Sequence, residues 1–447
     1  MIMRKTIVIT AAIAAATLTA QAKEWSLNEC VNYALEHNIS LQQKKITKLT
    51  AEQTTEAAEA QWLPSLSAST SQNVGWQPWK GENQNTVQNG QAVSSVDKTY
   101  YNGTYGINAN WTVWDGNQRQ NNIKLDKLAE QVAELDSATT ANSIQEQIIQ
   151  YYVQILYTIE AVEVSKEALE SAKANEQRGK TMVEVGSMSK ADLAQLTAQT
   201  AQTEYDLVSQ QSNLRNYKRQ LKQLLQITDE EEFDVQSPGA SDAQALQTIP
   251  ALRTVYEQAL LTRPEIEMAK LGVEEQELNI KIAKAGILPT VGLSGSVGTN
   301  TTSLSSDGFG SQLKTNFSGA AGVTVSVPLF DQKKTKTAVN KARLQQQSKI
   351  LELREQETAL WSDIEKYWLD ATLNQEKFKS AKVNSESAQT SYDLLAEQFK
   401  LGLKNIVELR TGKDNLLSAK QSELQSKYTA ILNIQMLKFY KGEPLTL

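Results

Sequence analysis

The residues able to perform covalent or metal chemistry are few in this 447-residue chain. His37 is the only histidine and Cys30 the only cysteine. No His/Cys metal set, nucleophile–histidine pair or internal disulfide can therefore be built from them. The run Arg178-Gly179-Lys180-Thr181 ends like a phosphate-binding loop, but Ala174 occupies the first glycine position and no strand precedes it. Acidic pairs on helical segments are more typical of solvated faces. The sequence predicts no enzyme, no cofactor and no metal site.

Composition indicates a mainly helical, exported protein. The chain has 8 prolines and 6% aromatic residues, with a mean hydropathy of −0.43, which favours long, partly solvated helices. The net charge is −6 and no basic stripe stands out, so no nucleic acid partner is expected. Arg4 and Lys5, an apolar run over 7–18 and Ala20-Gln21-Ala22 predict a signal peptide over residues 1–22. Cys30 does not lie at the cleavage point, so a lipid-anchored N-terminus is not expected.

Landmarks of different kinds recur in the same order, which indicates an internal duplication. Leu63-Pro64 matches Leu288-Pro289 at an offset of 225 positions, and Gly186 matches Gly402 at an offset of 216. Chance similarity between Ala/Gln-rich helices does not easily produce such an order. We therefore predict a first structural repeat over 23–226, a connector over 227–250 and a second repeat over 251–447.

Each predicted repeat contains a helix, two strands, a very long helix, a glycine turn and a further helix. The first helix should end at the Leu-Pro pair, because the residue before a proline is biased away from helical backbone. In the first repeat, helices are expected over 27–62, 116–178 and 188–226, and strands over 65–75 and 101–114. In the second, helices are expected over 251–287, 331–398 and 404–440, and strands over 290–299 and 317–329.

The predicted strands alternate between apolar and uncharged polar residues. Along 101–113 the odd positions include Tyr105, Ile107 and Trp111, whereas the even positions are Asn, Thr and Gly. A period of two places these sets on opposite faces of a sheet. The strands have about the 9–11 residues that span a bilayer when tilted, and five of the eight tryptophans lie around the first hairpin. Membrane strands with a polar, lumen-facing side are predicted in preference to a soluble sheet.

Four strands cannot close a barrel, and an open sheet edge in lipid leaves backbone groups unpaired. The chain is therefore expected to combine its strands with those of identical copies, and three copies give twelve strands. The long helices, of roughly 60 residues, would measure about 90 Å. Their narrow apolar stripe indicates coiled-coil packing, so a tube of helices is expected to continue the barrel.

The two strand-to-helix junctions share an aromatic-Asp pair, Trp114-Asp115 and Phe330-Asp331. Each aspartate can accept hydrogen bonds from free backbone N–H groups at the helix start, and Gln118 would complete a capping box. Each aromatic ring is of the type found at a membrane interface. These residues are predicted to hold the architecture and to perform no chemistry.

Over essentially its whole mature length, the chain resembles the TolC-like outer-membrane efflux protein family, also called outer membrane factors. The resemblance is carried by the duplicated Leu-Pro, the aromatic-Asp junctions and the hydrophobic-Gly turns. The first junction departs from the family pattern by lacking its Pro and second Gly, and the second by lacking both glycines. The resemblance implies a mainly α fold with transmembrane β: a homotrimer with a twelve-stranded β-barrel in the outer membrane and an α-helical barrel across the periplasm.

The family resemblance also implies a function and partners. It implies the exit duct of a tripartite efflux or type I secretion system, which docks onto a periplasmic adaptor and an inner-membrane pump and contacts outer-membrane lipid. The expected docking tips are Val185, Gly186, Ser187 and Met188 in the first repeat and Leu401, Gly402 and Leu403 in the second. Some relatives carry an aspartate ring as a gate, but the positions aligned with it, Ser385 and Ala388, are not acidic here. Glu386 and Asp393 are the nearest candidate gate residues.

A competing interpretation remains open from the sequence alone. The chain could be a soluble periplasmic coiled-coil scaffold whose hairpins pack as ordinary sheets. In the channel interpretation, the polar segment 80–97 should face outside the cell.

Overall fold

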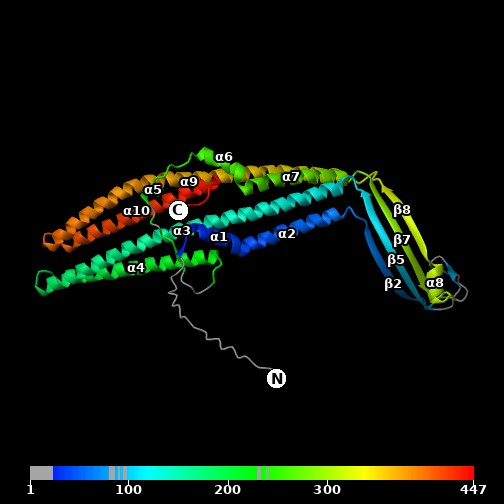
Figure 1. Cartoon of the computed structure of the whole chain (residues 1–447), viewed down its shortest axis with the longest axis horizontal. Helices are drawn as coiled ribbons and strands as arrows, with labels where there is room; N and C mark the ends of the chain where they lie inside the picture. The colour runs from blue at the N-terminus through cyan, green and yellow to red at the C-terminus, as the bar shows by residue number, and fades with distance from the viewer. Residues whose placement is uncertain are drawn as a thin grey trace, which may run out of the picture. The chain divides into compact units, whose positions relative to one another are not determined.

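The structure is a computed structural model that describes residues 24–79, 86–88, 91–93, 98–228, 233–237, 239 and 241–446. The predicted signal peptide, and most of the loop predicted to face outside, lie beyond these residues. Figure 1 shows long helices, strands and the short elements between them. The described helices are α1 (Leu27–His37), α2 (Ile39–Ala60), α3 (Gln118–Glu184), α4 (Lys190–Leu224), α5 (Asp242–Ala245), α6 (Leu252–Thr262), α7 (Pro264–Ala285), α8 (Phe309–Thr315), α9 (Lys334–Lys400) and α10 (Ile406–Tyr440).

The helices of the two halves match in length. Both α1 and α6 have 11 residues, α2 and α7 have 22, α3 and α9 have 67, and α4 and α10 have 35. Side-chain caps fix several starts: Ser26 and Glu29 form a capping box at α1, as Asn405 and Glu408 do at α10. Equal lengths keep the 225- and 216-residue offsets constant along each helix.

The prediction of one helix before each first strand was wrong. Asn38 has extended backbone (φ −64°, ψ 124°) and separates α1 from α2. Its side-chain oxygen accepts from the backbone N–H of Ser40 at 3.0 Å and so caps α2. In the second half, Pro264 at the first position of α7 separates it from α6, because a proline has no N–H to continue the helix.

Four strands form one antiparallel sheet in the order β2-β5-β7-β8. They are β2 (Ser65–Trp76), β5 (Thr99–Trp114), β7 (Thr290–Thr302) and β8 (Ser318–Ser326). Short strands were not predicted: β1 (Glu24–Trp25) pairs in parallel with β6 (Asp234–Val235), and β3 (Thr86–Gln88) pairs with β4 (Gln91–Val93). In the main sheet, β2 and β8 each have a strand neighbour on one side within the described chain.

The register sorts the sheet into one apolar and one polar face. In one row Ala68 pairs with Ile107, and Ile107 with Val297. In the next row Ser67 pairs with Asn108, and Asn108 with Ser296. The polar face repeats hydroxyl and amide side chains and carries no charged residue in the paired rows of β2, β5, β7 and β8. The predicted alternation is therefore present in the paired register.

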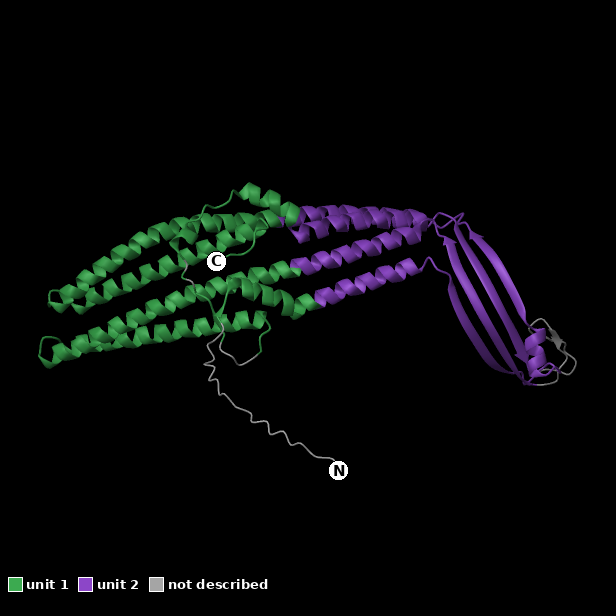
Figure 2. Cartoon of the chain, viewed as in Figure 1, with its two compact units in different colours: residues 1–42, 140–262, 360–447 green, residues 43–139, 263–359 purple. Residues whose placement is uncertain are grey.

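The chain divides into two compact units (Figure 2). Unit 1 comprises the described parts of 1–42, 140–262 and 360–447, and unit 2 comprises those of 43–139 and 263–359. The helices α3 and α9 contribute to both. Unit 2 holds the sheet with the helical segments that lead into and out of it, whereas unit 1 holds the two helical hairpins α3–α4 and α9–α10. Each unit therefore draws on both halves of the sequence.

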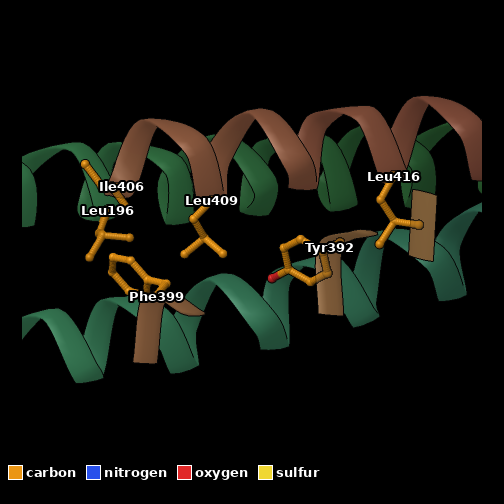
Figure 3. Packing of buried hydrophobic residues seen from close by; sticks show 6 residues of the cluster. All are labelled: Leu196, Tyr392, Phe399, Ile406, Leu409 and Leu416. Carbon is orange, nitrogen blue, oxygen red and sulfur yellow. The ribbon is translucent and has the colours of Figure 1, made fainter. Parts of the chain in front are cut away.

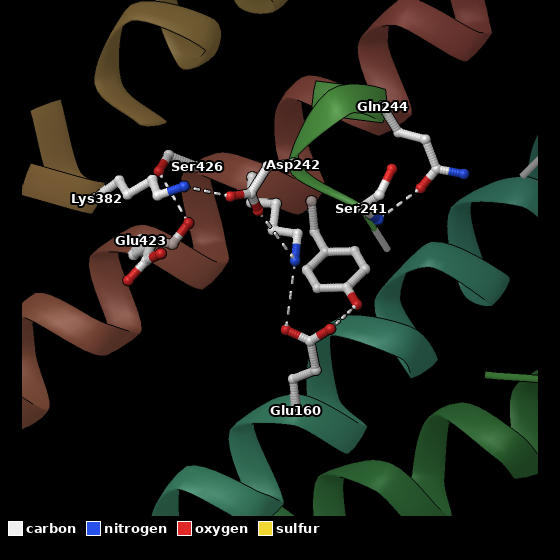
Figure 4. Close-up of polar contacts among 9 residues, drawn as sticks. Glu160, Ser241, Asp242, Gln244, Lys382, Glu423 and Ser426 are labelled. Carbon is white, nitrogen blue, oxygen red and sulfur yellow. Dashed lines mark hydrogen bonds and ion pairs between the residues drawn. The ribbon is translucent and has the colours of Figure 1, made fainter. Parts of the chain in front are cut away.

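A polar network fixes the short helix α5 within unit 1 (Figure 4). The Asp242 carboxylate accepts from Lys382 Nζ at 2.6 Å and lies 3.7 Å from Lys427 Nζ. The hydrogen bond from Lys382 is the main cause that lowers the pKa of Asp242 below its usual range. Glu160 accepts from the Tyr428 hydroxyl at 2.6 Å, which joins α3 to α10. Part of the predicted connector is thus tied to both α9 and α10.

Candidate functional site

Both helical hairpins of unit 1 reverse at a glycine with left-handed backbone. The φ angles are +74° at Gly186 and +71° at Gly402. The N–H that follows each glycine donates to the carbonyl of Met182 at 2.8 Å and of Gln398 at 2.9 Å. This is the bonding pattern of a Schellman motif, which ends a helix and reverses the chain. An added Cβ would meet no atom within 4 Å at either glycine, so a side chain there would cost only backbone strain.

Large apolar side chains lie exposed around both turns. Val185, Leu401 and Leu403 are each at least 70% exposed, whereas Met188 packs against a buried cluster. Ser187 is also exposed. Exposed apolar residues grouped at a tip are typical of a surface that binds another protein. The structure places all seven expected tip residues at these two turns.

A hydrophobic cluster behind the tips joins α4 to α9 and α10 (Figure 3). Its buried members are Leu196, Tyr392, Phe399, Ile406, Leu409 and Leu416. All are less than 9% exposed, so they hold the two hairpins together just above their turns.

Close helix packing near the tips uses glycine on opposite helices of the two hairpins. A Cβ at Gly179 on α3 would lie 2.5 Å from Cδ1 of Leu196 on α4. A Cβ at Gly412 on α10 would lie 2.6 Å from Cδ1 of Leu395 on α9. With the offset of 216, Gly179 corresponds to Leu395 and Leu196 to Gly412. The same contact therefore occurs twice with its partners exchanged, which sequence reasoning missed because it requires the pairing of helices.

The two candidate gate carboxylates lie on the exposed side of α9 in the single chain. Glu386 and Asp393 are seven residues apart, so they share one face of a coiled-coil helix. Asp393 accepts a hydrogen bond from the Gln389 side chain at 2.9 Å. Ser385 and Tyr392, each directly before one of the two carboxylates, are buried. The structure brings the two carboxylates to one side of the helix, and their role as a gate stays a prediction.

A lysine that the sequence reasoning missed lies beside Tyr392. The Tyr392 hydroxyl is 2.8 Å from the Ser171 hydroxyl, and Lys413 Nζ is 4.8 Å from the centre of the Tyr392 ring. Burial lowers the pKa of Lys413, and the nearby Lys420 lowers it further. The sequence signal was the heptad spacing of Lys413, Lys420 and Lys427 on α10. The latter two lie 3.2 Å from Glu167 and 3.9 Å from Glu160 on α3.

The first strand-to-helix junction is held by Asp115 and Arg119. As predicted, the Asp115 carboxylate accepts from a backbone N–H at the start of α3, that of Arg119 at 2.9 Å. The intervening Gly116 and Asn117 both have left-handed backbone, with φ of +71° and +68°. Trp114 is half-buried. The participation of Gln118 in a capping box stays a prediction.

The Arg119 side chain is only 4% exposed and contacts three elements. Its guanidinium donates to the carbonyls of Gln61 at 2.9 Å and Thr112 at 2.7 Å, and lies 3.8 Å from the ring centre of Trp62. The end of α2, the end of β5 and the start of α3 therefore meet at one cation. No role for Arg119 was predicted from the sequence.

The second junction repeats the backbone with different side chains. Asp331 accepts from the Thr335 N–H at 2.8 Å, and the Thr335 hydroxyl and N–H lower the pKa of Asp331. Gln332 and Lys333 have φ of +53° and +66°, in the left-handed region that favours glycine. Phe330 is 83% exposed. Both aspartates therefore accept a hydrogen bond from a backbone N–H at a helix start, as predicted. Both junctions also place two consecutive residues in left-handed backbone.

Two further observations concern the described residues. No group of three His, Cys, Asp or Glu side chains there is placed to hold a metal ion. No helix in the described ranges combines the length and apolar character needed to cross a membrane.

Comparison with known sequences gives a family match across both halves. The sequence model for the outer membrane efflux protein family matches residues 30–225 and 255–443. The chain is 19% identical over 337 residues to outer membrane efflux protein BepC of Brucella suis biovar 1, covering 74% of this chain and 70% of that protein. It is 20% identical over 411 residues to toxin and drug export protein A of Aggregatibacter actinomycetemcomitans, covering 92% and 84%.

Solved structures show the same fold. CusC superposes with a TM-score of 0.78 at 17% identity, covering 94% of this chain and 92% of CusC. The CmeC outer membrane channel of Campylobacter jejuni gives 0.76 at 19% identity, covering 94% and 87%. The open state of the MtrE outer membrane channel of Neisseria gonorrhoeae gives 0.75 at 17% identity, covering 94% and 89%.

Proposed function

Because the chain belongs to the outer membrane efflux protein family, we propose that three copies of it assemble into one continuous duct and dock end-on to a periplasmic adaptor. The protein is an outer-membrane exit duct of an efflux system, with its large helical part in the periplasm. Membership of this family does not favour the interpretation as a soluble scaffold. The family and the structural neighbours are channels and not enzymes.

The proposal of a trimer is based on the two open edges of the four-stranded sheet. Within the described chain, β2 and β8 each pair on one side only, and an unpaired edge is costly in lipid. The strands alternate in direction, so β8 of one copy can pair antiparallel with β2 of the next. Three copies would supply twelve strands, within the range of closed membrane barrels.

The two faces of the sheet suit this assembly. The face with Ala68, Ile107 and Val297 would meet lipid, and the face with Ser67, Asn108 and Ser296 would line a water-filled lumen. The helices would continue the barrel as a tube, with Glu386 and Asp393 in a constriction near its periplasmic end.

The two glycine turns would form the docking surface for the adaptor, and the inner-membrane pump would deliver the cargo. Each copy would present two turns with exposed apolar residues, so a trimer would present six. The buried cluster behind the turns supports this role because packing of the helices there positions the exposed side chains.

We also propose that the chain is a tandem duplication with repeats over 23–226 and 251–447 and a signal peptide over 1–22. The equal lengths of the four helix pairs support this division.

The role of the two turns in docking is tested with the double variant Gly186→Val and Gly402→Val. A side chain at left-handed φ costs about 1–2 kcal/mol per site, which is small against the buried surface of a trimer. We expect normal amounts of trimer in mild detergent and loss of export from cells. The matched control is Gly308→Val with Gly310→Val, where an added Cβ also meets nothing and φ is not left-handed. Full export by the turn variant at normal trimer levels would exclude the turns from docking, and a stable monomer of the natural protein would refute the trimer.

A further inference from the structure

Unpaired lysines gather at the second strand-to-helix junction. We call the basic patch the five exposed lysines at the end of α7 and the start of α9: Lys281, Lys284, Lys333, Lys334 and Lys336. Among the described residues, none of the five has an ion-pair partner. The two helix ends lie side by side, since a Cβ at Gly286 would lie 3.0 Å from Oγ1 of Thr335. Asp331 is the one acidic residue within these two helix ends (281–286 and 331–336).

The first junction has the same backbone and the opposite charge. The offsets of 225 and 216 pair the five lysines with Glu56, Glu59, Asn117, Gln118 and Gln120. Five positive charges in one junction therefore correspond to two negative charges and three neutral amides in the other. A general requirement of the strand-to-helix turn cannot explain the lysines, because the first junction makes that turn without them.

An ion pair of the first half becomes two cations in the second. Glu59 on α2 lies 2.7 Å from Lys127 on α3. The equivalent positions on α7 and α9 are Lys284 and Arg343. Like charges at such positions repel, so the second junction lacks internal compensation that the first possesses. An external anion would supply it.

The position of the basic patch indicates which anion. The patch lies where α7 leads to β7 on one side and where β8, which ends at Ser326, leads to α9 on the other. In the duct proposed above this is the periplasmic end of the membrane strands. Leu329 and Phe330, between the strand and the patch, are 94% and 83% exposed. Apolar side chains beside clustered lysines are the combination with which proteins bind an anionic membrane surface.

We propose that the basic patch binds anionic phospholipid headgroups of the periplasmic leaflet, with Leu329 and Phe330 in the adjoining acyl region. Three copies would then hold three anionic lipid sites, separated by first junctions that bind none. The proposal rests on the outer-membrane location and is independent of adaptor docking.

The test measures lipid binding to the full-length protein in a neutral detergent. Dioleoylphosphatidylglycerol and dioleoylphosphatidylethanolamine are added separately, and bound lipid is counted by native mass spectrometry. We expect preferential binding of phosphatidylglycerol that weakens as salt rises. The triple variant Lys333→Gln, Lys334→Gln and Lys336→Gln should bind phosphatidylglycerol about tenfold more weakly or worse, since each lysine near a headgroup contributes appreciably.

Two further variants complete the design. The control Lys45→Gln, Lys366→Gln and Lys377→Gln removes the same charge from exposed lysines elsewhere and should bind lipid like the natural protein. The transfer variant Asn117→Lys, Gln118→Lys and Gln120→Lys should gain phosphatidylglycerol binding at the first junction. Equal binding of both lipids, or of phosphatidylglycerol by the natural protein and the triple variant, would overturn the proposal. So would separation of the triple variant into monomers in lipid-free detergent while the control stays assembled, because the patch would then be a contact between copies.

Discussion

Substitution of Gly116 by alanine should disrupt the first junction more than any other glycine-to-alanine change at a turn. Two separate costs coincide there. Its φ of +71° is left-handed, which costs a residue with a Cβ about 1–2 kcal/mol. The added Cβ would also lie 2.8 Å from Leu288 Cβ and 3.3 Å from the Ala285 carbonyl oxygen. Overpacking of this kind costs a further 1–3 kcal/mol or so.

Two other glycines separate these costs. Gly186 has a φ of +74° but no atom within 4 Å of the added Cβ, and Gly295 has neither left-handed φ nor a close neighbour. Replacing glycine by alanine also stabilises by about 0.4–1 kcal/mol through the unfolded chain. The free energy of unfolding is therefore expected to fall by roughly 2–4 kcal/mol for Gly116→Ala and by roughly 1 kcal/mol for Gly186→Ala, and not to fall for Gly295→Ala.

The assay is the half-life of the assembled protein in detergent at a fixed elevated temperature, followed on gels. An unfolding rate is the appropriate quantity because membrane assemblies seldom unfold reversibly. If the lost interactions are absent from the unfolding transition state, each 1.4 kcal/mol shortens the half-life about tenfold. Equal half-lives for Gly116→Ala and Gly186→Ala would show that Leu288 moves aside without loss of stability. A half-life for Gly295→Ala shorter than that of the natural protein would refute the reasoning.

Two further changes test the second junction and the gate. Gln332→Gly should stabilise the assembly by about 1 kcal/mol because it relieves left-handed backbone, whereas Asn117→Gly should gain less since asparagine tolerates that conformation. The half-life assay compares the two variants, and an equal gain in half-life would contradict the strain argument. Glu386→Gln and Asp393→Asn should each lower the preference for cations in single-channel recordings with a salt gradient, and unchanged reversal potentials in both would leave the carboxylates as solvated helix residues.

The order of strands and long helices could be predicted because its signals are local. The period-two alternation around Ile107 marks a strand, and Leu63-Pro64 and Gly186 mark helix ends. Where a break depended on one residue with ambiguous preference, prediction failed. From the sequence, Asn38 is indistinguishable from an ordinary helical position. In the structure its side chain caps α2 and donates to the Leu224 carbonyl at 3.1 Å. Pro264 did give a local signal for the break before α7, and that signal was missed.

Contacts between distant segments could not be predicted from one sequence. The guanidinium of Arg119 bonds Gln61, 58 positions away, and no periodicity indicates that pairing. The network of Asp242 with Lys382 and Lys427 likewise depends on where α5 packs. The turn residues were placed correctly because a glycine turn is determined within a few residues, whereas what a turn binds depends on a surface outside the chain.

The comparison of the two halves separates what the backbone requires from what the side chains add. Both junctions place two consecutive residues at left-handed φ, yet one uses Gly116-Asn117 and the other Gln332-Lys333. A turn that persists without its glycines is imposed by the elements on either side, since local preference alone would favour another conformation. The side chains at the same positions are free to differ, and they differ in charge. A ring built from alternating halves needs equal geometry at every strand-to-helix turn, but equal chemistry is not required. Features that differ between the halves, such as the basic patch, are therefore where a role beyond the common architecture should be sought.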